Sequence, residues 1–423
     1  MRNNTVKVTA LSVRALLAGA AIIAAAGLVA ATPAFAEGKQ EGKQTNSAKL
    51  GKPLKEAHDD LNAKKYADAI AKLREAEGIP GKTPYDQHLI NDMLGFAYAR
   101  IQNYAEAAKA WEAELDDGFT AQSEIPTRVR QLAEANYQIK NYDKAIEFGN
   151  RAIKGGFADE ELKTLVGQAY YLKGDWKNTL RFEEGLVDDK IKNGQTPKSE
   201  SLQLILSACV KLNDSACETR ALEKIVTYYP KPDYWYQLLY TMRQQTSGND
   251  ANTLQTYRLM SEVDVLKSPE DFTEMAQLAL EAGSPGEAQR ILEKGIAKGV
   301  FTDPRAKSKN QRLLESAKKA AATDQTNLAK TERDADAAPT GAKNVGVGLA
   351  YLGYGQYDKA VDQFSKGLAK GGLRNESEAR LLLGIAQLKA GHKEDATKSF
   401  HAVKGDPSLE RLANLWSLHA KQA

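Results

Sequence analysis

The chain has 423 residues, 42% of them hydrophobic and 27% charged, with 58 Lys and Arg against 55 Asp and Glu. This balance excludes the strongly basic face that nucleic acid or an anionic membrane would require. The five histidines form no His-x-x-x-His or His-x-His pair, and the sequence contains no Walker loop and no Gly-x-Ser-x-Gly, so it predicts no metal site, no cofactor and no enzyme active site.

Residues 1–36 have the layout of a secretory signal peptide. Three basic residues precede an uncharged apolar run from residue 15 to residue 31, and the triplet Ala34-Phe35-Ala36 follows. The sequence therefore predicts cleavage between Ala36 and Glu37 and export to the bacterial periplasm. An uncleaved membrane anchor is the alternative, but the run is shorter than the ~20 residues that a membrane span prefers.

Cleavage would change the charge of the protein. The leader carries three basic residues and no acid, so its removal leaves 55 Lys and Arg against 55 Asp and Glu. Residues 37–52 are polar and predict a linker. No later segment is apolar for long enough to cross a bilayer, so we expect no stable membrane span after cleavage.

A spacing of twelve residues between small side chains recurs along the chain. Two antiparallel helices can approach closely where each carries a small residue at the crossing, and the spacing therefore predicts helical hairpins. Seven such pairs occur: Ala57 and Ala69, Gly95 and Ala107, Ala133 and Ala145, Gly167 and Thr179, Ala276 and Ala288, Gly348 and Ala360, and Gly384 and Ala396. Glycines that follow the second helices, as in 117–119, 155–157, 299–301 and 371–373, predict helix C-caps and not phosphate-binding loops.

The residues around these pairs resemble those of tetratricopeptide repeats. The motifs are Asn91-x-x-Leu94-Gly95-x-x-Tyr98 with Asn103-Tyr104 and Ala107-x-x-x-Trp111, then Asn344-x-x-Val347-Gly348-x-x-Tyr351 with Ala360-x-x-x-Phe364, and Arg380-x-x-Leu383-Gly384 with Ala396-x-x-x-Phe400. The resemblance implies an all-α solenoid of about ten antiparallel helical hairpins that binds other proteins.

The repeats predict an N-terminal array over 53–303. Within it, the register of 198–230 stays open between two crossing pairs, Leu206 with Glu218 or Cys209 with Ala221. Residues 232–265 keep the spacing but carry Leu where a small residue belongs. Cys209 and Cys217 flank one predicted turn of this array, and they form either a structural disulfide or two buried thiols.

The regular pattern weakens after residue 303. Residues 304–336 are charged and rich in alanine, and Ala317 and Ala329 predict a degenerate hairpin there, followed by a hinge at 337–341. Residues 341–423 predict further hairpins with a closing helix over 407–420 that covers the last one.

In the resembling family, the first helix of each hairpin lines a groove for a partner's peptide or helix, and helical phase identifies two sets of groove residues. The N-terminal set is aromatic, polar and cationic: Phe96, Arg100, Arg130, Tyr137, Gln168 and Tyr171. The C-terminal set is apolar: Val345, Leu349, Leu352, Leu381, Ile385 and Leu388. Burial of the apolar set by the closing helix is the alternative to a docking groove.

Residues 231–404 are similar to the periplasmic tetratricopeptide proteins that accompany TonB, ExbB and ExbD energy-transducing systems. The similar segments are 231–238, 282–295 and 370–386. The resemblance implies a periplasmic adaptor for such a complex. The alternatives are a general envelope-assembly or secretion scaffold, and an enzyme or enzyme accessory, for which the sequence offers no residue cluster.

Overall fold

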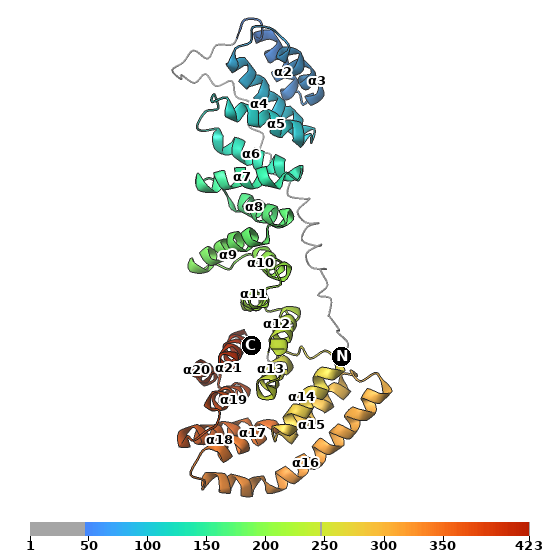
Figure 1. Ribbon diagram of the computed structural model, residues 1–423, viewed down its shortest axis with the longest axis vertical. Coiled ribbons are helices and arrows are strands. Elements are labelled where there is room, and N and C mark those ends of the chain that lie inside the picture. Colours follow the sequence, from blue (N-terminus) through green and yellow to red (C-terminus); the bar gives the residue numbers. More distant parts are fainter. Residues whose placement is uncertain (1–46, 246–247, 423) are drawn as a thin grey trace. The chain divides into compact units, whose positions relative to one another are not determined.

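A computed structural model describes residues 47–245 and 248–422, and these residues form twenty α-helices with no β-strand among them (Figure 1). They divide into two compact units, the first ending at Asp214 and the second beginning at Ser215. The predicted signal peptide, its cleavage site at Ala36 and Glu37, and the first part of the predicted linker lie outside the described residues. The all-helical fold predicted from the repeats is confirmed.

The first unit, unit 1, is a stack of helical hairpins (Figure 1). The first helices of its hairpins are α2 (Gly51–Asn62), α4 (Pro84–Arg100), α6 (Ile125–Gln138) and α8 (Glu160–Lys173), and the second helices are α3 (Tyr66–Glu77), α5 (Tyr104–Asp116), α7 (Tyr142–Lys154) and α9 (Trp176–Lys192). Helix α10 (Ser199–Lys211) ends the unit. The boundary between the units therefore falls inside the hairpin predicted over 198–230.

The small residues of the crossing pairs lie in the core, as their spacing predicts. Ala57, Ala69 and Ala107 are fully buried, and the absent side chain of Gly95 leaves room for the Trp111 ring. A Cβ atom added to Gly95 would lie 2.3 Å from that ring, far inside van der Waals contact. The hairpins are thus held by close helix crossings with an aromatic ring over the crossing point.

The start of unit 1 differs from the predicted linker. Leu50 is fully buried, the backbone N–H of Ser47 donates to Asp86, and α2 begins at Gly51. Residues 47–52 are therefore part of the packed unit. The linker prediction is wrong for this end of the segment because Leu50 supplies an apolar anchor.

The second unit, unit 2, also begins with paired helices. These are α11 (Ser215–Tyr228), α12 (Pro232–Gln245), α13 (Asp250–Glu262), α14 (Pro269–Glu281) and α15 (Pro285–Ala297). After α16 (Pro304–Asp336) come α17 (Ala342–Gly353), α18 (Tyr357–Lys370), α19 (Glu376–Lys389), α20 (Lys393–His401) and α21 (Pro407–Gln422). Helix α21 packs against α19 and α20, which agrees with the predicted closing helix.

The predicted degenerate hairpin over 304–336 is wrong, because α16 is one continuous helix of 33 residues (Figure 1). Its buried residues recur at helical spacing along one face: Asn310, Leu314, Ala317, Ala321, Leu328 and Ala335. Ala329 is exposed and makes no crossing with Ala317. A single apolar stripe favours one long helix lying across its neighbours.

The turn after α16 is anchored, whereas the sequence predicts a hinge there. The Lys370 ammonium donates to the carbonyl oxygens of Ala335 and Asp336 at 2.8 and 2.9 Å. The backbone N–H of Gly341 donates to the Gly371 carbonyl at 2.9 Å. These contacts tie the turn to the end of α18 and favour a fixed bend.

Unit 2 closes on itself around α13. Nine consecutive residues of this helix, Asn252 to Met260, are buried. Helix α21 contacts α13, and Gln255 donates to Glu378 of α19 at 2.9 Å. Helices from the beginning and the end of unit 2 therefore meet, which leaves little of α13 in contact with water.

Candidate functional site

The N-terminal set of predicted groove residues starts on α4. The Arg100 guanidinium lies 4.9 Å from the centre of the Phe96 ring, and the ring of Tyr66 of α3 meets the Phe96 ring edge-on at 6.3 Å. Both Phe96 and Arg100 are half-buried. The ring and the cation thus form a fixed pair on the surface of α4, the first helix of its hairpin.

The next residues of this set join neighbouring first helices. The Tyr137 hydroxyl on α6 donates to Gln168 Oε1 on α8 at 3.0 Å. The hydroxyls of Tyr171 on α8 and Ser207 on α10 are 2.7 Å apart. Burial raises the pKa of Tyr137 to about 12, so its hydroxyl stays protonated near neutral pH. The predicted residues therefore form a seam of hydrogen bonds along α6, α8 and α10.

Arg130 is not free to bind a partner's carboxylate, contrary to its predicted place in a groove. Its guanidinium donates to Glu134 at 2.8 Å and to Glu161 at 2.9 Å, and it also pairs with Asp159. Burial lowers the pKa of Arg130, but the hydrogen bonds to Asp159 and Glu134 outweigh that effect and raise it overall. Arg130 links α6 to the start of α8.

The apolar C-terminal set does not form an open groove. Leu352, Leu381 and Ile385 are buried, and Val345 and Leu349 are partly buried, as is Leu388. The prediction of a docking groove is wrong for the three buried residues, because the chain's own helices occupy that side. This outcome matches the closing-helix alternative in part, since α21 packs against α19, which carries Leu381 and Ile385, whereas α15 packs against α17, which carries Leu352.

What remains between these helices is a cavity of about 230 Å³ inside unit 2. Leu352, Ile385 and Trp416 line its apolar part. Its polar part includes Arg258 and Glu287, which form a buried two-bond pair at 2.8 and 2.6 Å. These two charged groups at the cavity are therefore paired with each other.

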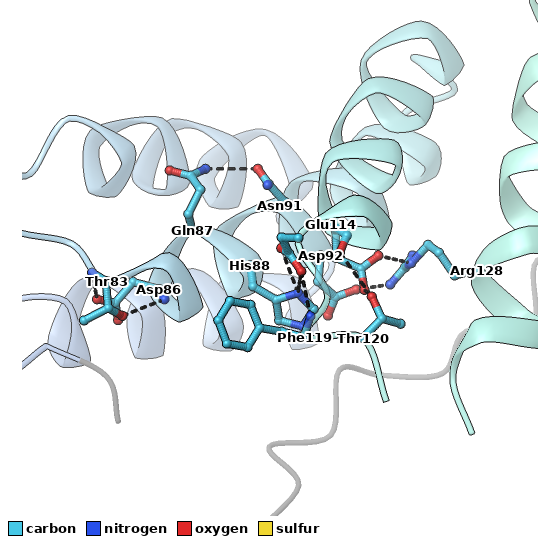
Figure 2. A network of polar contacts seen from close by, with 11 residues as sticks. Thr83, Asp86, Gln87, His88, Asn91, Asp92, Glu114, Phe119, Thr120 and Arg128 are labelled. Carbon is cyan, nitrogen blue, oxygen red and sulfur yellow. Dashed lines mark hydrogen bonds and ion pairs between the residues drawn. The ribbon is translucent and has the colours of Figure 1, made fainter. Parts of the chain in front are cut away.

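A polar network that the sequence did not reveal joins α4, α5 and α6 (Figure 2). Figure 2 shows Arg128 of α6 reaching toward Asp92 of α4 and Glu114 of α5, and ion pairs join Arg128 to both carboxylates. The guanidinium also lies 5.1 Å from the centre of the Trp111 ring. One arginine thus fixes the positions of α4, α5 and α6.

Glu114 is the buried member of this network. Burial raises its pKa, and the charge of Arg128 opposes that shift. Thr120, in the loop after α5, donates to Glu114 Oε1 at 2.9 Å. These contacts hold the loop between α5 and α6 against the helices, and their role is structural.

His88 lies beside this network, although no sequence motif distinguishes it. Its Nδ1 atom is 3.1 Å from both carboxylate oxygens of Asp117. Tyr85 stacks on the imidazole at 5.8 Å and Phe119 packs at 5.9 Å. The imidazole lies between aromatic rings, and its contact with Asp117 joins α4 to the end of α5.

The cysteines are both oxidised. Cys209 in α10 and Cys217 in α11 are disulfide-bonded, and neither is a free thiol. Of the two crossing pairs predicted for residues 198–230, burial favours Cys209 with Ala221. Both of these residues are buried, whereas Leu206 and Glu218 are only partly buried.

The described residues contain neither a metal-binding cluster nor a membrane-spanning helix. Within 47–245 and 248–422, no three His, Cys, Asp or Glu side chains are placed to hold a metal ion. Across the same residues, no helix combines the length and apolar character that a membrane span requires.

Comparison with known proteins finds similarity to one repeat family in both units. Residues 93–160 and 348–408 match the tetratricopeptide repeat model. The match supports a protein-interaction scaffold. The matched residues include Gly95 with Trp111 in unit 1. In unit 2 they include Gly348 with Phe364 and Gly384 with Phe400.

The similar proteins resemble only parts of the chain or resemble it distantly. A stretch of 118 residues is 26% identical to FK506-binding protein 5 from Rhizopus delemar, covering 28% of this chain and 30% of that protein. A structure of Naa15/Naa10 bound to HypK-THB is 14% identical with a TM-score of 0.40, covering 88% of this chain and 62% of that one. A tetratricopeptide repeat protein from Parabacteroides merdae is 12% identical with a TM-score of 0.30, covering 81% and 100%.

Proposed function

We propose that this protein is an exported scaffold of the bacterial periplasm that holds segments of partner proteins against the first helices of unit 1. The observation that carries the proposal is the seam along α6, α8 and α10, where aromatic and polar side chains are held by contacts such as Tyr137 with Gln168. Side chains that are already ordered lose little entropy when a partner binds. The leader-like sequence over 1–36 supports export.

Within this function, we propose an adaptor role in a TonB-type complex. The similarity of residues 231–404 to periplasmic proteins that accompany TonB, ExbB and ExbD supports this assignment. A general envelope-assembly or secretion scaffold is the alternative, and the two differ in the partners that they would bind.

Site-specific crosslinking in intact cells tests the proposal. A photo-crosslinking amino acid would replace Phe96 or Tyr137, and the control would carry it at Lys109, an exposed residue of the second helix α5. We expect partner adducts at the first two positions and not at the third. TonB, ExbB or ExbD in the adducts would support the adaptor role, and outer-membrane or secretion factors would favour the alternative.

Fractionation of the same cells tests export separately. We expect the mature chain in the periplasmic fraction with Glu37 as its first residue. A cytoplasmic chain that retains residues 1–36 would overturn the proposed location.

A further inference from the structure

Charge is distributed unevenly along α16. Its first half, residues 304–319, contains six basic residues and a single acid, whereas residues 320–336 contain four acids and two basic residues. The chain as a whole is nearly balanced, so this separation is local. A helix with one basic end presents a fixed electrostatic pattern to its surroundings.

Three of the four acids in the second half of α16 bind groups inside unit 2. The Tyr354 hydroxyl donates to Asp324 at 2.6 Å, and the Tyr351 hydroxyl donates to Glu332 at 2.7 Å. Asp336 accepts from Asn344 at 3.0 Å and pairs with Lys366. These bonds attach the second half of α16 to α17 and α18.

The basic residues in the first half have no such role. Arg305, Lys309 and Arg312 are exposed, follow one stripe of the helix at i, i+4 and i+7, and form no ion pair within the described chain. Lys318 differs, because it pairs with Glu293 of α15 at 3.0 Å. Three neighbouring cations therefore remain without an internal partner.

These cations line a groove on the surface of unit 2. The groove has a volume of about 620 Å³ and lies between α16 and Gln277 of α14. Leu313 and Pro304 add apolar surface to its lining and Ser308 adds a hydroxyl. The hydrogen bond between Thr273 and Asn310, at 2.9 Å, holds the two helices together.

Helix α14, which contributes Gln277 to the lining of the groove, carries the other sign of charge beside it. Glu270, Glu274 and Glu281 are exposed and share the helical stripe of Gln277 on α14. Glu274 accepts from Tyr257 and Arg243, whereas Glu270 and Glu281 form no ion pair within the described chain. An anionic stripe beside a cationic one disfavours a uniformly anionic ligand such as nucleic acid or a lipid surface.

We infer that the groove between α14 and α16 binds an α-helix of a partner protein whose carboxylates, spaced at i, i+4 and i+7, face Arg305, Lys309 and Arg312. A helix laid along α16 has the same rise per residue, so its acidic stripe can meet all three cations at once. Basic residues on the neighbouring stripe of the partner would face the glutamates of α14. The inference rests on the proposed scaffold function and specifies one class of partner.

A peptide titration on the full chain tests this assignment. The probe is a labelled helical peptide of about 20 residues, long enough to span about 30 Å, with glutamates at i, i+4 and i+7 and lysines on the adjacent stripe. The control peptide has the same composition with its glutamates distributed around the helix. We expect the patterned peptide to bind more tightly, with an affinity that falls as salt is raised.

Two charge-reversed variants locate the site. The variant Arg305→Glu, Lys309→Glu and Arg312→Glu should weaken binding by about tenfold or more, because three favourable contacts become repulsive. The matched variant Lys319→Glu, Lys330→Glu and Arg333→Glu makes the same change of net charge on exposed positions of the same helix and should bind normally. Equal helix content in both variants, measured by circular dichroism, shows that the fold is retained.

Several results would overturn the inference. These are equal binding of the two peptides, equal binding by the two variants, or tighter binding of single-stranded DNA or phosphatidylglycerol vesicles through the same three residues. If crosslinks at Phe96 persist while the groove variant binds the peptide normally, the partner-class assignment fails and the scaffold function stands. If the crosslinks at Phe96 and Tyr137 are absent while the peptide binds as expected, the proposed use of unit 1 fails instead.

Discussion

The carboxyl group of Glu183 lies against Gly167, where a Cβ atom added to the glycine would be 1.8 Å from Glu183 Oε1. Glu183 follows Gly167 by sixteen residues, the same separation that places aromatic rings over the glycine in three other hairpins. Those pairs are Gly95 with Trp111, Gly348 with Phe364, and Gly384 with Phe400. The crossing of α8 and α9 therefore contains a buried acid where an aromatic ring is usual in this chain.

This position predicts a pH-dependent stability of unit 1. Burial raises the pKa of Glu183 to about 7, and the Ser201 hydroxyl and Lys198 oppose that shift. The folded state holds the proton to a higher pH than the unfolded state. The free energy of unfolding should therefore decrease as the pH rises from about 4.5 to about 7. The loss should be about 3 kcal/mol in that interval.

The Glu183→Gln variant should lose this part of the pH dependence, measured by denaturant unfolding at several pH values. Glu147→Gln, at an exposed position of α7, is the control for loss of one carboxylate. An identical slope in the wild type and the Glu183 variant would show that this carboxyl is ionised in the folded state throughout the range.

Two glycines of α17 predict opposite effects of the same substitution. A Cβ atom at Gly348 would lie 2.8 Å from the Phe364 ring, whereas one at Gly346 would meet nothing within 4 Å. Gly348→Ala should therefore destabilise unit 2 by about 1–3 kcal/mol, since the buried ring must move. Gly346→Ala should stabilise it by about 0.5–1 kcal/mol, because alanine favours the helix.

Thermal unfolding of the two variants checks this prediction directly. Because the sites are two residues apart in one helix, differences in helix end effects are small. Equal melting temperatures for the two variants would contradict the close crossing of α17 and α18.

The pair formed by Arg258 and Glu287 predicts strong coupling between α13 and α15. Both side chains are almost fully buried, at 5% and 9% exposed. Removal of one partner, as in Glu287→Gln, leaves an uncompensated buried charge and should destabilise unit 2 by about 3–5 kcal/mol. Replacement of both, as Arg258→Met with Glu287→Leu, should recover most of that loss.

A double-mutant cycle in urea measures the coupling. Lys298→Ala, which removes an exposed pair with Asp264, is the comparison and should change stability by less than about 1 kcal/mol. Additive effects of the two core substitutions would mean that the buried charges do not depend on each other.

The oxidised cysteines predict a thiol count. Unreduced, denatured protein should show no thiol that reacts with Ellman's reagent, and reduction should release two. Loss of a cross-link over so short a loop should lower stability by about 2–3 kcal/mol. Two reactive thiols before reduction would indicate that Cys209 and Cys217 are reduced in the native protein.

The crossings of the hairpins could be predicted because their signal is local. A small residue such as Ala133 needs a second one, Ala145, at a fixed distance along the same hairpin, and both are fully buried. The single helix α16 could not be distinguished from a hairpin in this way. Its alanines fit either structure, and the choice depends on partners such as Tyr354 that lie beyond the repeat itself.

The groove residues were predicted less well because helical phase does not report distant contacts. Phase placed Tyr137 and Gln168 correctly on first helices, and they meet across α6 and α8. It could not show that Arg130 binds Glu161, or that the helices of unit 2 bury Leu381. The role of Glu114 was missed because a glutamate in a helix ordinarily lies in solvent.

The closure of unit 2 around α13 has a consequence for the order of folding. In an open repeat array, each hairpin needs only its neighbours and can fold as it emerges during synthesis. Helix α13 instead depends on residues such as Glu378 and Asp406, which follow Gln255 and Asn252 by 123 and 154 positions. Because such long-range contacts form slowly, unit 2 should fold as one cooperative body only after α21 has been made, whereas unit 1 can form hairpin by hairpin.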